Sequence, residues 1–581
     1  MEWFRDNYED YWELKEPPRS SQIDILREVD EALESGYPNI IINAGVGIGK
    51  SAIASTIANT YDNGYIATKS VSLQNQYIND FNNLVEFKGR SHYICNYLNE
   101  DMERYRTCAE CYMKYLTKFG KVEDKRRELN THGRKWEYYP NVSKEEYDRI
   151  IAELRMQPCW TDCEYLQALH IAEKSPYVVV NYHSLYYNSI IVKNRLKPRD
   201  IIVFDECHNL ENIARDIIGF PLNPNTFHME YGIDVFETNE PDGLYDIDHW
   251  RVVFGTAYDI IEEKRSDLQS QLDNIDIHFN QKINAIALKM LINEYDIKLS
   301  ELNHILMTLS DDMYVKLPED ESKHKLYVKG NGIEFKPLFG KEYVKNFLGL
   351  GGVRLFLTGT LPRPGVYKKW IGLNNNNTYY YYKKSPYHVE NRPIYCLGFD
   401  NFKSRFDDNG DYVWMKYENI LKIKELLWKH DGKNIVIHTT SKDQTKWLYD
   451  NLKHDFSVET WIAEDGFEAI DDFKRNNYSN VLISPSVYEG VDFKGDSCTV
   501  QIILKVPYPR VDEITKKRCD ADIFYLNWWT AVKLEQIYGR GIRSESDKCI
   551  TYILDKEFEI WYKHKGGRMY LSEYFREAII K

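Results

Sequence analysis

Residues 39–58 read NIIINAGVGIGKSAIASTIA: a buried strand, a glycine-rich turn, and then a helix of small and apolar residues. The turn holds a phosphate-loop motif, with alanine in place of the usual first glycine, made of Ala44, Gly45, Val46, Gly47, Ile48, Gly49, Lys50 and Ser51. Its glycines let backbone N–H groups approach phosphate oxygens at the positive end of the helix. We expect Lys50 to reach the β and γ phosphates of ATP and Ser51 to bind Mg²⁺. A glycine turn with an exposed lysine is the alternative, and the flanking strand and helix argue against it.

A second strand-like run, IIVFDECHNL at residues 201–210, ends in acidic residues. Asp205, at the end of a buried strand, is placed to hold Mg²⁺, and the adjacent Glu206 is placed to orient and activate the attacking water. Acidic pairs are common in surface turns, so this run alone indicates little. Together with the phosphate loop it predicts an ATP-hydrolysing site in an α/β fold.

Six further short motifs are spread along the chain: PRSSQ (18–22), ATKSVSLQNQY (67–77), LFLTGTLP (355–362), IVIHTTS (435–441), ISPSVYEGVDFKGD (483–496) and QIYGRGIR (536–543). With the DECH segment they resemble, in content and in order, the motifs of superfamily-two helicases. The resemblance implies two RecA-like motor domains with parallel sheets, and ATP bound in the cleft between them.

Within these motifs the resemblance assigns roles to single residues. Arg19 and Gln22 are similar to the motif that reads the adenine base. The residues that would link the state of the bound nucleotide to the binding of a DNA strand are Thr358, Thr360, Glu489, Gly490 and Asp492. The residues that would contact strand phosphates, which position a strand without reading its sequence, are Thr68, Gln74, Thr439 and Ser441.

The last motif also has a mechanical reason. Arg540 and Arg543 are three apart, so we expect them to share one face of a helix and, with Gln536, to reach the γ phosphate when the cleft closes. An arginine finger of this kind accelerates hydrolysis by roughly 10³–10⁵. A surface helix with solvated arginines is the alternative, and the ordered motifs before it favour the finger.

Five of the ten cysteines lie within 69 residues of one another: Cys95, Cys108, Cys111, Cys159 and Cys163. In a reducing compartment such a group indicates a metal site rather than disulfides. A Cys₄ zinc site and an iron–sulphur cluster both use paired cysteines. Random clustering of buried cysteines is the remaining alternative, and buried cysteines have no reason to crowd one segment.

The cysteine segment lies where the iron–sulphur helicases of the XPD and DinG family carry a cluster domain. FKGRSHYIC (87–95) is similar to that family's approach to its first ligand, and CEYLQALHIAEK (163–174) to its exit from the last. The resemblance implies a 4Fe–4S cluster on four of the five cysteines, with Cys159 as the expected spare. Cys207 belongs to the DECH segment, and the cysteines expected in ordinary core positions are Cys396, Cys498, Cys519 and Cys549.

The expected layout therefore has four parts. The first motor domain comprises residues 1–90, 165–215 and 345–390, interrupted by an iron–sulphur domain at 91–164 and an Arch-like helical domain at 216–344, and residues 391–581 form the second motor domain. Alternating strand-like and helical runs after residue 391 are typical of a parallel sheet with crossover helices.

Two patterns give local expectations. Apolar residues recur at three- and four-residue steps and predict one amphipathic helix through Leu268, Leu272, Ile275, Phe279, Ile283, Ile286 and Met290. NNNNTYYYY (374–382) is interpreted as a surface loop without function.

Composition limits the remaining classes. Hydrophobic content of 43% and charged content of 28% are ordinary for a globular protein. A net charge of −14 neither favours nor excludes a polyanionic partner, because a local basic groove can lie on an acidic body. The first residues lack a signal-peptide profile and no apolar run approaches membrane-spanning length, so we expect a cytoplasmic protein without a membrane partner.

The sequence thus predicts an ATP-dependent DNA helicase that acts as a monomer on single-stranded and forked DNA, in repair or replication. The resemblance implies 5′→3′ translocation. No nuclease-like segment precedes the phosphate loop, so no fused nuclease is expected. Two alternatives stay open: a DNA-stimulated ATPase that remodels protein–DNA complexes without unwinding, and a scaffold subunit of a repair complex.

Overall fold

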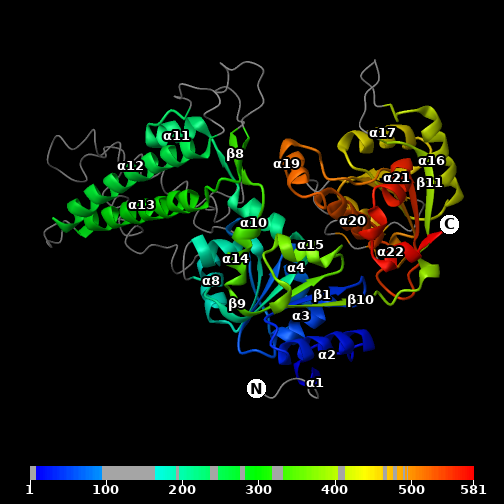
Figure 1. Cartoon of the computed structure of the whole chain (residues 1–581), viewed down its shortest axis with the longest axis horizontal. Coiled ribbons are helices and arrows are strands. Elements are labelled where there is room, and N and C mark those ends of the chain that lie inside the picture. Colours follow the sequence, from blue (N-terminus) through cyan, green and yellow to red (C-terminus); the bar gives the residue numbers. More distant parts are fainter. Residues whose placement is uncertain are drawn as a thin grey trace, which may run out of the picture.

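The computed structural model describes residues 8–93, 164–191, 195–235, 246–274, 282–316, 332–402, 413–461, 468–475, 480–487, 491, 493 and 495–580. Two seven-stranded parallel sheets, each covered by helices, form two α/β domains, as the sequence predicts. We call them domain 1 and domain 2. Figure 1 shows domain 1 below, domain 2 to the right, and a third part, inserted in domain 1, to the upper left.

The sheet of domain 1 has the order β10 (Thr378–Lys383), β1 (Asn39–Ala44), β9 (Gly351–Thr358), β5 (Arg199–Asp205), β2 (Gly64–Thr68), β4 (Tyr177–Asn181) and β3 (Val85–Phe87). Side chains alternate between its faces, so Ile40 and Ile42 pack in one core and Ile41 in the other. Because all strands are parallel, the carboxyl ends of β1, β5 and β9 meet at one edge, where the phosphate loop, the DECH segment and residues 358–360 follow.

The helices of domain 1 lie on both faces of this sheet. They are α1 (Tyr8–Tyr11), α2 (Ser20–Glu34), α3 (Lys50–Ala58), α4 (Val71–Asp80), α8 (Glu164–Lys174), α9 (Tyr182–Tyr186), α10 (Leu210–Ile218), α14 (Lys341–Leu348) and α15 (Pro364–Trp370). Single turns of 3₁₀ or π type occur at η1 (Arg90–His92), η2 (Tyr187–Ile191), η3 (Cys207–Asn209), η6 (Asn375–Asn377) and η7 (Val389–Asn391).

The sheet of domain 2 has the order β13 (Ser457–Thr460), β14 (Asn480–Ser484), β12 (Ile435–His438), β15 (Val500–Ile503), β16 (Ile550–Asp555), β11 (Ile394–Asp400) and β17 (Ile579–Ile580). Its helices are α16 (Tyr417–Lys429), α17 (Lys442–Leu452), α18 (Glu468–Arg475), α19 (Glu513–Ala521), α20 (Tyr525–Tyr538), α21 (Lys556–His564) and α22 (Glu573–Glu577), with single turns η8 (Gly495–Ser497) and η9 (Gly567–Met569). Its central strands β12 and β15 are buried throughout, as in a sheet covered on both faces.

The part inserted between α10 and α14 is not purely helical. A small antiparallel sheet, ordered β6 (Phe220–Leu222), β8 (Ile333–Pro337) and β7 (Met313–Lys316), carries α11 (Pro224–Tyr231), α12 (Ile247–Asp273) and α13 (Lys282–Thr308). The expectation of one helix through residues 268–290 is wrong, since α12 ends at Asp273 and α13 begins at Lys282. The two long helices lie side by side (Figure 1), so each covers the apolar stripe that the other could not bury alone.

The interpretation of residues 374–382 as a loop is also wrong. Residues 378–383 form β10, which pairs with β1 from Asn39↔Thr378 to Ala44↔Lys383. Tyr379 and Tyr381 pack against the core beneath α2, whereas Tyr380 lies on the other face. A tyrosine run suits a pleated, half-buried edge, and β10 thereby carries the chain from domain 1 towards domain 2.

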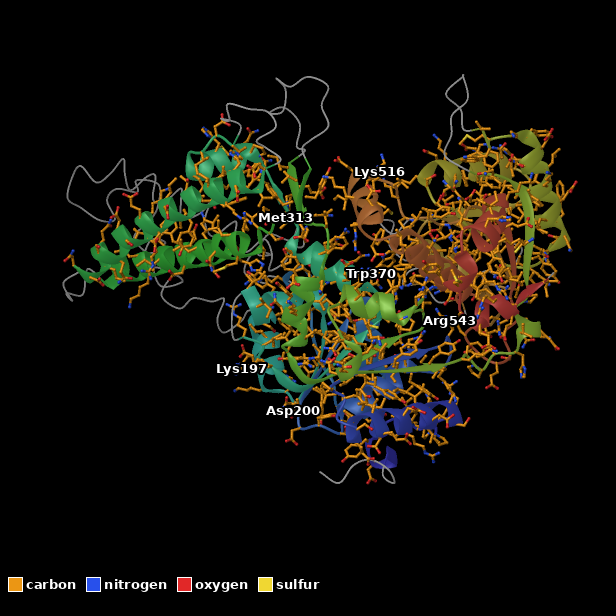
Figure 2. All side chains as sticks on the ribbon, in the orientation of Figure 1. Lys197, Asp200, Met313, Trp370, Lys516 and Arg543 are labelled. Carbon is orange, nitrogen blue, oxygen red and sulfur yellow. The ribbon has the colours of Figure 1, made fainter. Side chains whose placement is uncertain are left out.

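Domains 1 and 2 touch through buried polar contacts. The Glu211 carboxylate of α10 pairs with the Arg518 guanidinium of α19 at 2.7 Å, and Trp370 Nε1 donates to Asp522 Oδ2 at 2.7 Å. The Trp528 indole donates to the Pro362 carbonyl. Figure 2 labels Trp370 and Arg543 where the two domains meet. Within the described residues, no helix is both long and apolar enough to cross a membrane.

Candidate nucleotide site between the two domains

The phosphate loop joins β1 to α3 in the predicted geometry. Gly47 and Gly49 have φ of 82° and 85°, in the left-handed region that favours glycine. Arg19 reaches this loop, because its Nη1 donates to the Gly47 carbonyl at 2.9 Å and its Nη2 to the Ile48 carbonyl at 3.3 Å. Gln22 Oε1 in turn accepts from Arg19 N at 2.8 Å. In this conformation the two predicted adenine-reading residues therefore brace the loop.

Asp205 ends β5 directly below the loop. Its carboxylate is buried, and the Tyr77 hydroxyl, which also hydrogen-bonds Ser51, donates to Asp205 Oδ2 at 3.1 Å. Burial and the neighbouring Glu206 raise the pKa of the Asp205 carboxyl to about 6, and Lys50 opposes that rise. Hydroxyl and carboxylate oxygens are the ligands that Mg²⁺ prefers, so Ser51 and Asp205 fit the predicted magnesium site.

Sequence reasoning did not find Tyr77. It closes the motif at residues 67–77, but a tyrosine on a helix gives no sign that its hydroxyl joins two residues of other motifs. Tyr77 is fully buried, and burial together with Asp205 raises the pKa of its hydroxyl well above the usual value. It therefore stays a neutral donor.

Glu206 has φ of 50°, an unusual left-handed conformation for a residue with a side chain. This turn points its carboxylate towards His208, whose Nδ1 lies 3.3 Å from Glu206 Oε2. Burial alone would raise the pKa of Glu206, but the charges of Lys50, His208, Arg540 and Arg543 lower it overall. Glu206 thus stays ionised, as a residue that accepts a proton from water must be.

His208 connects three motifs. Its Nδ1 is 2.9 Å from Thr358 Oγ1, and its Nε2 is 2.8 Å from Gln536 Nε2 in domain 2. Thr358 Oγ1 also accepts from the backbone N–H of Thr360 at 3.2 Å. The two threonines are buried, so they act within the protein, between the DECH segment and the segment that follows β9.

The expectation that Arg540 and Arg543 share a helical face is wrong. The helix α20 ends at Tyr538 and Gly539 follows as its cap, so both arginines lie in the turn beyond it. Arg540 Nη1 donates to the Val491 carbonyl at 3.0 Å, and Arg543 N donates to Asp547 Oδ2 at 2.7 Å. Glycines at positions 539 and 541 favour the end of the helix here, because glycine has a low helix propensity. Both guanidinium groups still act on Glu206 across the cleft.

The residues predicted to contact a DNA strand differ in their exposure to solvent. Ser441 is partly exposed and caps α17, accepting from Gln444 N at 3.3 Å. Thr68 and Thr439 are buried at the carboxyl ends of β2 and β12. Gln74 is fully buried, and its Nε2 donates to the carbonyls of Phe87 at 3.0 Å and Val179 at 3.2 Å. In this conformation Gln74 supports the edge of the β-sheet, and its side chain is not exposed to a DNA strand.

Some predicted residues lie outside the described part of the chain: Cys95, Cys108, Cys111, Cys159, Cys163, Glu489, Gly490 and Asp492. Among the residues that are described, no group of three or more histidine, cysteine or acidic side chains is arranged to hold a metal. Of the cysteines expected in core positions, Cys498 and Cys549 are buried and Cys519 is half-buried. Cys396 is exposed on β11, so that expectation is wrong for Cys396.

Comparison with known proteins agrees with this geometry. Residues 15–226 match the family "Type III restriction enzyme, res subunit", and residues 423–575 match "Helicase C-terminal domain". The chain is 22% identical to the 3′-5′ exonuclease DinG of Bacillus subtilis, over 95% of this chain and 70% of that protein. It is also 22% identical to the ATP-dependent DNA helicase YoaA of Haemophilus influenzae, over 93% of this chain and 91% of that protein. The chain is an XPD/DinG-type helicase of superfamily two.

A solved XPD helicase structure has the same fold as this XPD/DinG-type helicase. It aligns with a TM-score of 0.55 and 16% identity, over 95% of this chain and 98% of the other. Domains 1 and 2 are therefore the two motor domains of an ATP-dependent helicase. The side chains gathered between them come from both domains, as a nucleotide site between two motor domains requires.

Proposed function

We propose that this helicase hydrolyses ATP in the cleft between its motor domains, moves 5′→3′ along single-stranded DNA, and unwinds the duplex ahead. The observation that carries the proposal is the contact of His208 with Gln536 beside an ionised Glu206. It joins the hydrolytic residues of domain 1 to domain 2, so hydrolysis and domain movement are coupled. The names of the relatives and the predicted strand contacts support DNA as the substrate.

The geometry supports the following roles in hydrolysis. The loop N–H groups and Lys50 would hold the phosphates, and Ser51 with Asp205 would hold Mg²⁺, which would neutralise phosphate charge. Glu206 orients water and accepts its proton, because its carboxylate is ionised and lies at the loop edge. Arg540 and Arg543 stabilise the charge that develops on the γ phosphate.

The strand would run across the carboxyl ends of both sheets. There α4 begins after Ser70 and α17 after Ser441, and each helix would turn the positive end of its dipole towards a strand phosphate. Thr68 and Thr439 lie at the adjoining strand ends and remain part of this proposal. Such contacts do not depend on sequence, so binding to single-stranded DNA should weaken steeply with salt.

An iron–sulphur cluster is part of the proposal. Tyr93 and Tyr165 flank the cysteine segment in the sequence, and the rings of these two residues lie 5.7 Å apart. Arg90 lies over the Tyr165 ring at 5.1 Å and holds the same junction. The described residues that flank the cysteine segment thus lie side by side, which suits a segment closed by one 4Fe–4S cluster on four cysteine thiolates. The cluster segment and the 220–337 insert would then form the wedge at a fork. The proposed helicase works as a monomer in the cytoplasm.

The deciding experiment measures strand displacement with ATP on forked duplexes that carry only a 5′ or only a 3′ single-stranded tail. Wild type should open the 5′-tailed substrate alone, and Lys50→Ala should open neither. Lys197→Ala is the matched control, because Lys197 is exposed at the amino end of β5, away from the loop. Opening of the 3′-tailed duplex would overturn the polarity. Strong DNA-stimulated hydrolysis without any opening would identify a remodelling translocase instead.

A further inference from the structure

The segment that connects the two motor domains passes directly over the nucleotide site. Residues 384–393 join β10 of domain 1 to β11 of domain 2. At its start, Gly45 N donates to the Lys383 carbonyl at 2.9 Å and Ser385 Oγ donates to the Val46 carbonyl at 2.7 Å. A side chain at Gly45 would collide with Ser385, so the connector and the phosphate loop are in close contact.

Two residues further on, Tyr387 contacts both halves of the site. Its ring and hydroxyl occupy the space that a Cβ at Gly47 would need, so it packs directly on the phosphate loop. Its hydroxyl donates to the Arg543 carbonyl at 2.5 Å. The side chain is only 4% exposed, so its position is set by the protein and not by solvent. Tyr387 therefore touches the loop of one domain and the arginine-bearing turn of the other.

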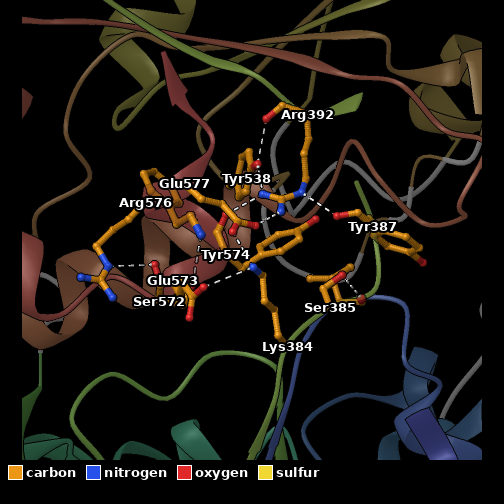
Figure 3. Close-up of polar contacts among 12 residues, drawn as sticks. Lys384, Ser385, Tyr387, Arg392, Tyr538, Ser572, Glu573, Tyr574, Arg576 and Glu577 are labelled. Carbon is orange, nitrogen blue, oxygen red and sulfur yellow. Dashed lines mark hydrogen bonds and ion pairs between the residues drawn. The ribbon is translucent and has the colours of Figure 1, made fainter. Parts of the chain in front are cut away.

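A buried cluster centred on Arg392 holds the backbone of Tyr387 in place (Figure 3). Arg392 is fully buried, and its Nε donates to the Tyr387 carbonyl at 3.1 Å. Its Nη1 donates to the Tyr538 hydroxyl at 2.9 Å and to the Tyr574 carbonyl at 2.5 Å, and Nη2 pairs with Glu577. The guanidinium also lies 3.5 Å from the centre of the Tyr574 ring. These contacts tie the connector to the end of α20 and to α22.

The backbone of Arg543 is consequently held on both sides. Asp547 accepts from its N–H at 2.7 Å, and Tyr387 donates to its carbonyl. No helix supports this residue, since α20 ends five positions earlier at Tyr538. These two bonds, with the packing of Tyr387 against Gly47, hold the backbone from which the Arg543 side chain extends.

We propose that Tyr387 is a positioning residue for ATP hydrolysis: it sets Arg543 against the phosphate loop and makes the placement of this arginine depend on the connector between the motor domains. The proposal rests on the nucleotide cleft proposed above. Tyr387 does not touch the reacting atoms; it acts through Arg543. A movement of the domains that shifts the connector would then shift the arginine with it.

The test is Tyr387→Phe, which keeps the ring on Gly47 and removes only the hydroxyl. We expect kcat for DNA-stimulated ATP hydrolysis to fall about three- to tenfold, the effect of one lost hydrogen bond, with KM for ATP and affinity for single-stranded DNA unchanged within about twofold. Tyr65→Phe is the matched control, because its buried hydroxyl also donates to a backbone carbonyl, that of Lys197 at 2.8 Å, away from the cleft.

A mutant cycle separates positioning from general structural damage. In an Arg543→Ala background, Tyr387→Phe should cause no further loss of kcat, because the residue through which it acts is gone. An unchanged kcat for Tyr387→Phe alone, or full additivity of the two losses, would overturn the proposal. A wild-type protein that hydrolyses no ATP would instead overturn the proposed function. The two failures are therefore distinguishable.

Discussion

His208 Nε2 and Gln536 Nε2 lie 2.8 Å apart across the boundary between the two motor domains, 328 positions apart in the sequence. His208 belongs to the DECH segment and also contacts Thr358, whereas Gln536 lies in the last turn of α20. The contact links the residues proposed to hydrolyse ATP to the domain proposed to move during hydrolysis. It gives the first of five predictions.

Gln536→Ala should lower the rate of DNA-stimulated ATP hydrolysis about fivefold, because the loss of the hydrogen bond that links the two domains costs about 1 kcal/mol. ADP affinity should stay within about twofold of wild type, since Gln536 is not part of the loop. Steady-state hydrolysis and ADP titration check both parts. Gln269→Ala, which removes an exposed bond to Asp273 on α12, should change neither. An equal loss in the two variants would contradict the prediction.

Tyr77→Phe should raise the Mg²⁺ concentration needed for half-maximal ATP hydrolysis several-fold. The hydroxyl donates to Asp205 Oδ2 and hydrogen-bonds Ser51, so its removal loosens both expected ligands of the ion. A Mg²⁺ titration at saturating ATP measures the effect. Tyr182→Phe is a close control, because the buried Tyr182 hydroxyl donates to the Asp205 backbone carbonyl at 2.9 Å and not to the carboxylate. Identical Mg²⁺ curves for Tyr77→Phe and wild type would exclude this role.

Glu535 should make stability depend on pH. Burial raises the pKa of its carboxyl from 4.5 to about 7, although the Ser572 N–H and Arg576 oppose the rise, and Tyr380 and Tyr382 also face it. The folded state therefore binds more protons between these values. Its contribution is complete below about pH 4.5 and is lost as the pH rises through about 7.

Glu535→Gln removes this titration, so the variant should gain up to about 3 kcal/mol relative to wild type above pH 7, and little at acid pH. Denaturant unfolding on either side of neutral pH measures the difference. A variant whose advantage is the same at every pH would show that Glu535 does not titrate near 7. Glu559→Gln is a suitable control, because Glu559 is exposed on α21 and pairs with Lys563.

The buried pair of Glu211 and Arg518 should be sensitive to loss of one partner. Arg518→Met leaves a buried carboxylate without its cation and should destabilise the protein by about 3–5 kcal/mol. Adding Glu211→Gln should recover most of that loss, because the uncompensated charge is then gone. Thermal unfolding of both variants measures this. Arg251→Met removes ion pairs to exposed Asp248 and Asp311 and should cost far less than Arg518→Met.

The cysteine segment should bind iron. Purified under reducing, oxygen-free conditions, wild type should contain about four iron and four sulphide ions per chain, and Cys163→Ser should lose most of both while keeping ATP hydrolysis. Cys159→Ser should retain the iron, because Cys159 is the expected spare. Cys396→Ser is the control, since Cys396 is exposed on β11. Zinc in place of iron in the wild type would contradict the prediction.

The sequence alone determined the two parallel sheets and the placement of their principal motifs. A phosphate loop needs a strand, glycines and a helix in immediate succession, so residues 39–58 predict their own structure. The same holds for β5 and the acidic residues at its end. Prediction from the sequence failed where contacts with distant segments determine the structure. The tyrosine run at 378–383 forms a strand because it pairs with the edge of β1. Likewise, Arg540 and Arg543 leave the helix and are held by bonds from other segments.

Only the tertiary structure decided which side chains support the motifs. Tyr77 meets Asp205 across 128 positions, Tyr387 meets Arg543 across 156, and Arg518 meets Glu211 across 307. None of these residues has a local pattern that reveals its partner, because hydrogen bonds and buried ion pairs depend on distances in space. Motifs are readable in sequence because their chemistry requires neighbouring residues. The residues that hold these motifs in place depend on how the sheets and helices pack, because packing brings remote segments within hydrogen-bonding distance.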